Sequence, residues 1–220
     1  MYRTLKRIMD LVIATVAFIL FSPLLIPIAI ALRFSGEGEV FYFQERVGLN
    51  NKSFDIWKFA TMLKNSPNIG TGDVTVKNDP RVLPMGNFLR KTKINELPQI
   101  INVFNGTMSI VGARPLTRIS VDMYSSDVQE VIYNSPPGIT GIGSIVFRDE
   151  ETLIDKSGMP AREFYEKFIL PHKGNLEKWY QVNKSLYVDI MIVFLTAWVI
   201  VFSKSNLVYK VFPDLPKRSF

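Results

Sequence analysis

The 220-residue chain contains no cysteine and only one histidine, His172. Without thiols it can form neither disulfides nor zinc–thiolate sites, and a cysteine nucleophile is excluded. A single histidine cannot build a histidine-based metal cluster. Oxygen ligands for a hard cation remain possible.

Acidic residues are also fewer than basic ones. Lysine and arginine total 26 against 20 aspartates and glutamates, which gives a net charge of +6. This excess suits an anionic partner, such as a phosphate-rich ligand or an acidic membrane leaflet. Nucleic acid would suit the charge too, but the sequence has no recognition-helix or stacked-aromatic pattern. We therefore expect no nucleic-acid partner.

The length suits one domain plus an anchor. Apolar residues gather near both ends of the chain rather than spreading evenly, which indicates membrane contact. The sequence predicts a membrane anchor over residues 1–35, a small cytosolic catalytic domain with interfacial helices over 36–205, and a C-terminal tail over 206–220.

A run without charge, Leu11 to Leu32, is 22 residues long and could cross a bilayer as a helix. Ser22-Pro23 falls in its middle and Pro27 follows one turn later, so we expect a break there. Basic residues flank the run on both sides, which draws both ends to the cytoplasmic side. We favour a re-entrant helix-break-helix hairpin; the alternative is a kinked helix that spans the membrane once.

The remaining pattern predicts a mixed α/β fold that is mostly helical. Aromatic and β-branched residues at 40–43 and 54–59, separated by a polar turn, predict a β-hairpin. Helical periodicity follows at 116–133 and at 164–187. The second helical stretch mixes basic with aromatic residues, and the apolar run at 190–202 is too short to span, so both predict interfacial amphipathic helices. Residues 65–77, rich in Asn, Gly, Ser and Thr, predict a surface loop.

The segment from residue 89 to 115 carries the clearest chemical signal. Three basic residues precede the tetrapeptide Asn-Glu-Leu-Pro at 95–98, and Gly-Ala-Arg-Pro follows at 112–115. A cationic cluster, an acidic centre and a glycine-containing turn therefore lie close together in the sequence. A site for a substrate with several phosphates requires such a grouping.

This segment resembles the signature of the bacterial sugar transferases, the monotopic polyprenyl-phosphate phosphoglycosyl transferases. In that family Asp-Glu-Leu-Pro-Gln precedes Gly-Asp-Met-Ser and Val-Gly-Pro-Arg-Pro. Other family motifs match at 44–48, at 58–62, at 79–81 and at 137–141, and the resemblance runs from Lys6 to about Thr196. The chain departs from the family pattern at five positions: Ala60, Lys93, Asn95, Thr107 and Ala113.

The resemblance implies an enzyme that moves a sugar 1-phosphate from a UDP-sugar to undecaprenyl phosphate and releases UMP. This reaction would start the synthesis of a bacterial exopolysaccharide, O-antigen or capsule, or of another surface glycoconjugate. The resemblance also implies Mg²⁺ as cofactor and a place on the cytoplasmic face of the bacterial inner membrane. Downstream glycosyltransferases remain open as further partners.

The family's site residues carry over to five positions of this chain. Glu96 would bind Mg²⁺, and Asn95 stands where the family has its nucleophilic aspartate, so the two form the implied catalytic pair. Lys58, Arg90 and Arg114 would bind substrate phosphates. An ammonium suits a point contact with a phosphoryl oxygen, and a planar guanidinium binds two such oxygens.

Asn95 leaves four interpretations open, because an amide has neither the charge nor the nucleophilicity of a carboxylate. Glu96 could be the nucleophile, or the sugar phosphate could pass directly from donor to acceptor. The asparagine could also be an engineered replacement that traps the enzyme. Finally, the chain could be a non-catalytic homologue that binds polyprenyl phosphate or scaffolds glycosyltransferases.

Overall fold

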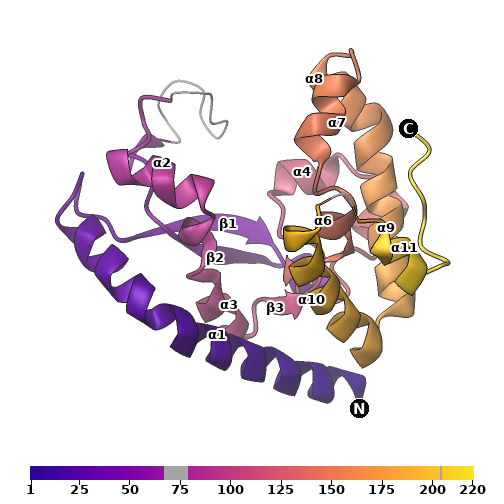
Figure 1. Ribbon diagram of the computed structural model, residues 1–220, viewed down its shortest axis with the longest axis horizontal. Helices are drawn as coiled ribbons and strands as arrows, with labels where there is room; N and C mark the ends of the chain where they lie inside the picture. Colours follow the sequence, from indigo (N-terminus) through magenta and orange to yellow (C-terminus); the bar gives the residue numbers. More distant parts are fainter. Residues whose placement is uncertain (67–78, 204) are drawn as a thin grey trace. The chain divides into compact units, whose positions relative to one another are not determined.

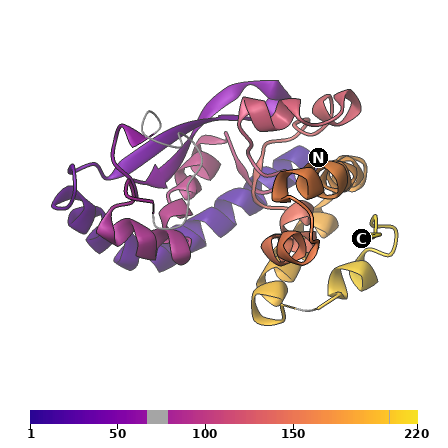
Figure 2. The ribbon, with the colours of Figure 1, turned by 90° about the horizontal axis from the view of Figure 1, so that it is seen from above.

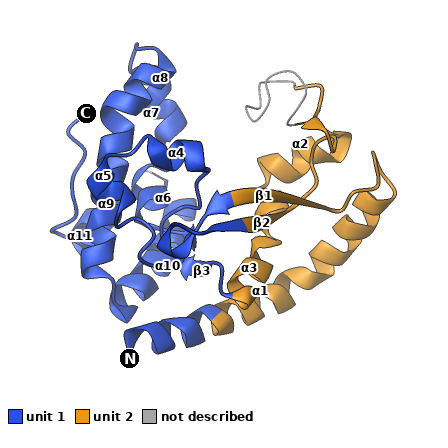
Figure 3. Cartoon of the chain, turned by 180° about the vertical axis from the view of Figure 1, so that it is seen from behind, with its two compact units in different colours: residues 1–10, 46–54, 106–220 blue, residues 11–45, 55–105 orange. Residues whose placement is uncertain are grey.

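The computed structural model describes residues 1–66, 79–203 and 205–220, so most of the predicted loop at 65–77 lies outside the described residues. The fold is mixed α/β and mostly helical, as the sequence predicts (Figure 1). The chain forms two compact units (Figure 3). Unit 1 comprises residues 1–10, 46–54 and 106–220, and unit 2 comprises residues 11–45 and 55–105.

The apolar N-terminal run forms one helix, α1 (Tyr2–Arg33), with Pro23 and Pro27 inside it. The predicted helix-break-helix form is therefore not seen. Pro23 lacks the N–H that would bond the carbonyl of Ile19 four residues earlier. The hydroxyl of Ser22 donates to that same carbonyl at 3.1 Å. The Ser22 hydroxyl thus takes the place of the missing backbone N–H, which explains how the helix continues past the proline.

By length and composition α1 could cross a membrane. Its most apolar stretch has a mean hydropathy of 2.6, and no other described helix meets the same criteria. Its first turns, to Asp10, belong to unit 1 and the rest to unit 2.

Unit 2 is built on a β-hairpin and short helices. The strands β1 (Phe41–Val47) and β2 (Ser53–Phe59) pair side by side, which confirms the predicted hairpin (Figure 2). The last two residues of β1 and the first two of β2 belong to unit 1. The helices that follow are α2 (Pro84–Lys91), the 3₁₀ turn η3 (Ile94–Glu96) and α3 (Gln99–Asn105). The core of the unit joins α1, β2 and α2 through Ile28, Leu32, Phe59 and Leu89.

Unit 1 contains a small parallel sheet, β3 (Ser109–Val111) beside β4 (Gly138–Thr140). The strands pair with Ser109 opposite Gly138 and Val111 opposite Thr140. The Pro-Gly-Ile-Thr-Gly motif thus lies beside the Met-Ser-Ile-Val part of the signature. Glycine is required at 138 because a Cβ there would lie 2.1 Å from the Gly112 nitrogen.

Helices surround this sheet. The apolar helix α10 packs against both strands and against α6. The helical stretch predicted at 116–133 is instead two short helices, and the one at 164–187 passes through a π-helical turn before α9. The helical elements of unit 1 are η1 (Leu49–Asn51), α4 (Arg118–Asp122), α5 (Ser126–Gln129), α6 (Ile142–Val146), α7 (Glu150–Lys156), α8 (Ala161–Phe164), η4 (Tyr165–Ile169), α9 (Leu170–Asn183), α10 (Leu186–Val201) and α11 (Leu207–Val211).

The start of α1 is held in unit 1 by a buried ion pair. Lys6 Nζ lies 3.1 Å from Asp189 Oδ2 and donates to the carbonyl of Val111 at 2.9 Å. The Asp189 side chain is completely buried, and the hydroxyls of Tyr2 and Tyr180 also donate to it. The pair therefore links α1 to both β3 and α10.

A second buried carboxylate holds the next turn of α1. Asp10 Oδ1 accepts hydrogen bonds from Ser109 Oγ and from the Ile110 amide, each at 3.0 Å. The Lys6 and Asp10 side chains thus have a structural role in positioning β3.

Candidate active site

The five predicted site residues are divided between the two units. Lys58 lies on β2, Arg90 in the last turn of α2, and Asn95 and Glu96 in η3, all within unit 2. Arg114 follows β3 in unit 1, so its position is described only within that unit.

A tight turn brings Arg90 and the Asn95-Glu96 pair onto neighbouring elements. Between α2 and η3, Lys93 adopts a left-handed conformation with φ of 61°. Such a conformation is uncommon for a residue with a Cβ and reverses the chain sharply. As a result η3 packs against α2.

Asn95 and Glu96 differ in exposure. The Asn95 side chain is buried, with 9% of its surface exposed, whereas Glu96 is half-buried. Among the described residues no group hydrogen-bonds to Asn95 Oδ1. A buried acceptor without a donor costs about 1–3 kcal/mol and is uncommon in native proteins. This amide oxygen is therefore a candidate contact for a ligand.

Lys58 and the aromatic cluster of the hairpin lie on opposite faces, because successive strand residues point to opposite faces. Lys58 Nζ lies 3.5 Å from Gln44 Oε1, a contact between β2 and β1. On the other face Phe41 packs on both Trp57 and Phe59, with ring centroids 5.3 and 5.7 Å apart. Lys58 thus points away from the aromatic cluster of Phe41, Trp57 and Phe59.

Close backbone contact fixes the helix that carries Arg90. A Cβ at Gly86 would lie 2.1 Å from the Thr61 carbonyl oxygen, so α2 rests directly on the chain after β2. Beside the Gly86–Thr61 contact, Arg90 Nη1 lies 3.4 Å from the Sδ atom of Met62, the residue after Thr61. The guanidinium therefore starts from a rigid helix end, as a phosphate-binding arginine requires.

Asn102 is a site-positioning residue that the sequence did not predict. It is buried on α3, its Oδ1 accepts from the Trp57 amide at 2.9 Å, and its Nδ2 donates to the Asp55 carbonyl at 2.7 Å. It thus completes two hydrogen bonds of β2, next to Lys58. In the sequence, only the Asn-Val pair at 102–103, which belongs to the family signature, marked Asn102. The pair shows no helical or strand periodicity.

The site's possible metal ligands are few. In the described part of the chain no three His, Asp or Glu side chains gather as a metal site would require. Mg²⁺ commonly binds one or two protein carboxylates and takes its other ligands from substrate phosphates and water. Glu96 supplies one such carboxylate, and its sequence neighbour Asn95 supplies an amide oxygen that has no hydrogen-bond partner among the described residues.

The turn that carries Arg114 is held by Tyr133. Its hydroxyl donates to the Arg114 carbonyl at 2.8 Å and accepts from the Leu116 amide at 3.0 Å. The side chain of Arg114 is exposed. The backbone of the Gly-Ala-Arg-Pro turn is thus fixed, while the Arg114 guanidinium extends away from the buried part of unit 1.

Residues 1–203 match the protein family described as bacterial sugar transferase. A UDP-glucose:undecaprenyl-phosphate glucose-1-phosphate transferase of Escherichia coli (strain K12) is 39% identical over 200 residues, which cover 89% of this chain and 40% of the relative. A UDP-N-acetylgalactosamine-undecaprenyl-phosphate N-acetylgalactosaminephosphotransferase of Aeromonas hydrophila is 34% identical over 197 residues, covering 89% and 43%.

The exopolysaccharide production protein ExoY of Rhizobium meliloti (strain 1021) is similar over most of its length. It is 32% identical over 216 residues, which cover 91% of this chain and 87% of ExoY. The chain thus spans about two fifths of the two larger relatives and nearly all of ExoY.

We predict that Asn102→Leu destabilises unit 2 by about 1–3 kcal/mol, because it leaves the Trp57 amide and the Asp55 carbonyl, both partly buried, without their side-chain partner. The measurement is thermal unfolding together with hydrogen exchange at the Trp57 amide. Asn105→Leu, an exposed change on the same helix, is the matched control. Equal melting temperatures and equal exchange in the two variants would contradict the assigned role of Asn102.

Proposed function

Because the chain belongs to the bacterial sugar transferase family, we propose that it transfers a sugar 1-phosphate from a UDP-sugar to undecaprenyl phosphate. The reaction releases UMP and starts the synthesis of an exopolysaccharide or another surface glycoconjugate. The observation that carries this proposal is the Asn95-Glu96 site. There an amide oxygen is buried without a hydrogen-bond partner among the described residues, the next residue is a half-exposed carboxylate, and η3 packs against the helix whose last turn carries Arg90.

Each charged residue then has a separate task at the donor diphosphate. Glu96, with Asn95 Oδ1 beside it, would hold Mg²⁺ against the diphosphate oxygens. The cation would neutralise charge on the leaving UMP. Arg90 would bind phosphate oxygens from the end of α2, and Lys58 would make a point contact from β2. For Arg114 in unit 1 the phosphate-binding role implied by the family resemblance is a separate proposal.

We assign Asn95 a binding role and propose direct transfer. An oxygen of undecaprenyl phosphate attacks the β-phosphorus of the UDP-sugar. The bond from that phosphorus to the oxygen of the α-phosphate breaks, and UMP leaves with the electron pair. Atoms and charge balance without an enzyme-bound intermediate, so no side-chain nucleophile is needed.

Both ends of α1 pack against folded parts of the chain. Its start is bound to β3 and Asp189 within unit 1, and its end packs on Phe59 and Leu89 within unit 2. No other described helix is long and apolar enough to cross a membrane. We propose a re-entrant α1 with both ends at the cytoplasmic face of the inner membrane, because basic residues flank its apolar stretch on both sides.

The first test of the function uses purified protein in detergent with a panel of UDP-sugars and Mg²⁺. We expect the natural sequence to release UMP only when undecaprenyl phosphate is also present. Asn95→Asp restores the family carboxylate, so it should release about one UMP per protein molecule without the lipid.

Two outcomes would overturn direct transfer. Release of UMP by the natural sequence without the lipid would assign the nucleophile to Glu96. Release by Asn95→Asp alone would identify the chain as a trapped or non-catalytic homologue that binds without turning over. Asn95, Thr107 and Ala60 are the residues that favour this second reading.

The topology of α1 can be tested with single cysteines, because the chain contains none. We expect Thr4→Cys and Phe34→Cys, both at exposed positions, to react with a membrane-impermeant maleimide only after the bacterial membrane is permeabilised. Leu20→Cys, in the middle of the run, should be shielded by lipid. Labelling of either end from outside intact cells would show instead that α1 spans the membrane.

A further inference from the structure

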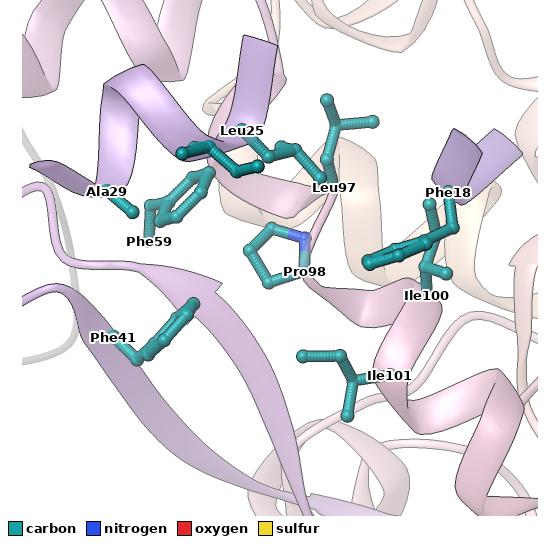
Figure 4. A pocket seen from close by; sticks show the side chains of 10 residues that line it. Phe18, Leu25, Ala29, Phe41, Phe59, Leu97, Pro98, Ile100 and Ile101 are labelled. Atoms are coloured by element: carbon teal, nitrogen blue, oxygen red, sulfur yellow. The ribbon is translucent and has the colours of Figure 1, made fainter. Parts of the chain in front are cut away.

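A pocket of about 310 Å³ lies at the start of α1, and every residue that lines it belongs to unit 1. Its walls come from the first turns of α1, from η1 and from the segments at 106–108 and 134–136, together with Lys184 just before α10. It differs in kind from the cavity of unit 2 in Figure 4, whose lining side chains are all apolar. We call the pocket of unit 1 the α1-start pocket.

The α1-start pocket is rich in positive charge. One carboxylate lines it, that of Asp10, against the basic side chains of Arg3, Lys6, Arg7 and Lys184. Spacings of three and four residues place the three basic residues of α1 on one face of the helix. Cations that share one space repel each other unless anions compensate them.

Compensation within the protein is incomplete. Lys6 is paired with Asp189, and Asp10 offsets one further charge. Arg3 and Lys184 form no ion pair with any other residue that the structure describes. The four basic residues set against Asp10 and Asp189 therefore leave two positive charges in the pocket.

A chain of side-chain hydrogen bonds holds Lys184 at the pocket wall. Its Nζ donates to Gln181 Oε1 at 2.8 Å, and Gln181 Nε2 donates to Ser135 Oγ, which is buried, at 2.9 Å. Burial lowers the pKa of Lys184, and the charges of Arg3 and Lys6 lower it further. The ammonium thus lies in an electropositive space, where a bound anion would stabilise its charged form.

We propose that the α1-start pocket binds the phosphate monoester of a small hydroxylated molecule, such as a phosphorylated polyol or sugar. A phosphate monoester carries a charge of about −1.5 to −2 at pH 7, which matches the charge that the protein leaves uncompensated. The guanidinium of Arg3 can bind two phosphate oxygens, and the ammonium of Lys184 makes a point contact. The pocket shares no residue with the proposed active site.

The other lining groups define the rest of the ligand. Asn50, Asn134 and Ser135 supply amide and hydroxyl groups that can hydrogen-bond to ligand hydroxyls. A cavity of about 150 Å³ accepts a benzene-sized molecule, so the pocket has room for roughly ten to fifteen non-hydrogen atoms. A phospholipid headgroup fits less well, because its phosphate is a diester with one negative charge and leaves one positive charge unmatched.

The test uses glycerol 3-phosphate and the full chain in nanodiscs of zwitterionic lipid, with binding measured by isothermal titration calorimetry. We expect glycerol 3-phosphate to bind and glycerol, which lacks the phosphate, not to bind. Arg3→Gln and Lys184→Gln should each raise the Kd at least fivefold, because each removes a charge that has no ion-pair partner. Arg3 is exposed, so its replacement tests the pocket even where Lys184→Gln affects folding.

The matched control is Lys156→Gln, which removes one exposed positive charge on α7 and should leave the Kd unchanged. Hydrogen exchange should show slower exchange over residues 2–7 and 134–136 when the ligand is bound. The absence of binding, or an equal rise in Kd for Lys156→Gln, would overturn the proposal. A rise in Kd for Lys58→Gln, with none for Arg3→Gln, would place the ligand at the proposed active site instead.

A last arm distinguishes a soluble ligand from a lipid. Phosphatidylglycerol carries the same glycerol phosphate as a diester, so nanodiscs that contain it should leave the Kd for glycerol 3-phosphate within twofold. Loss of binding in those nanodiscs would overturn the proposal, because the pocket would then be a lipid-headgroup site. None of these measurements requires turnover, so their outcome is independent of the transferase activity.

Discussion

The rest of unit 1 depends on one buried ion pair. Lys6 and Asp189 are both removed from water, and each is satisfied by the other and by Val111, Tyr2 or Tyr180. Breaking such a pair by removing one partner commonly costs about 3–5 kcal/mol, because a lone charge stays buried. The pair therefore fixes where the membrane-compatible helix α1 meets β3, the strand that ends at the Gly-Ala-Arg-Pro turn.

Unit 2 is organised by a separation of polar from apolar side chains at short range. Along the chain, Glu96 belongs to the charged site, and the next residue, Leu97, lines an apolar cavity. Across β2, Lys58 faces away from Trp57 and Phe59. A reaction between a polar nucleotide sugar and a lipid phosphate needs such a boundary, since the two substrates must meet at their phosphates while their other ends enter different surroundings.

The sequence predicted the hairpin and the mixed, mostly helical fold, because aromatic alternation and helical periodicity are local signals. It did not predict that α1 continues past Pro23, since that depends on the rotamer of Ser22. It also missed the division of residues 116–133 into α4, which Thr117 caps by accepting from the Ser120 amide, and α5, which begins at Ser126. Asn102 was missed because its partners lie on a strand more than forty residues away in sequence. The motif predicts Glu96 and Arg90 as site residues, but motif spacing holds no information about the apolar cavity that Leu97 and Pro98 line.

The most direct measurement follows the sugar-linked phosphate itself. Purified chain would be incubated with Mg²⁺, undecaprenyl phosphate and UDP-glucose or UDP-N-acetylgalactosamine, the donors in its relatives' names, carrying ³²P at the β-phosphate. We expect the label to move into the organic-extractable lipid and Glu96→Gln to abolish this transfer. Label that stays in the aqueous phase with every UDP-sugar offered, while the protein still binds the lipid, would contradict it and leave the chain as a binding protein.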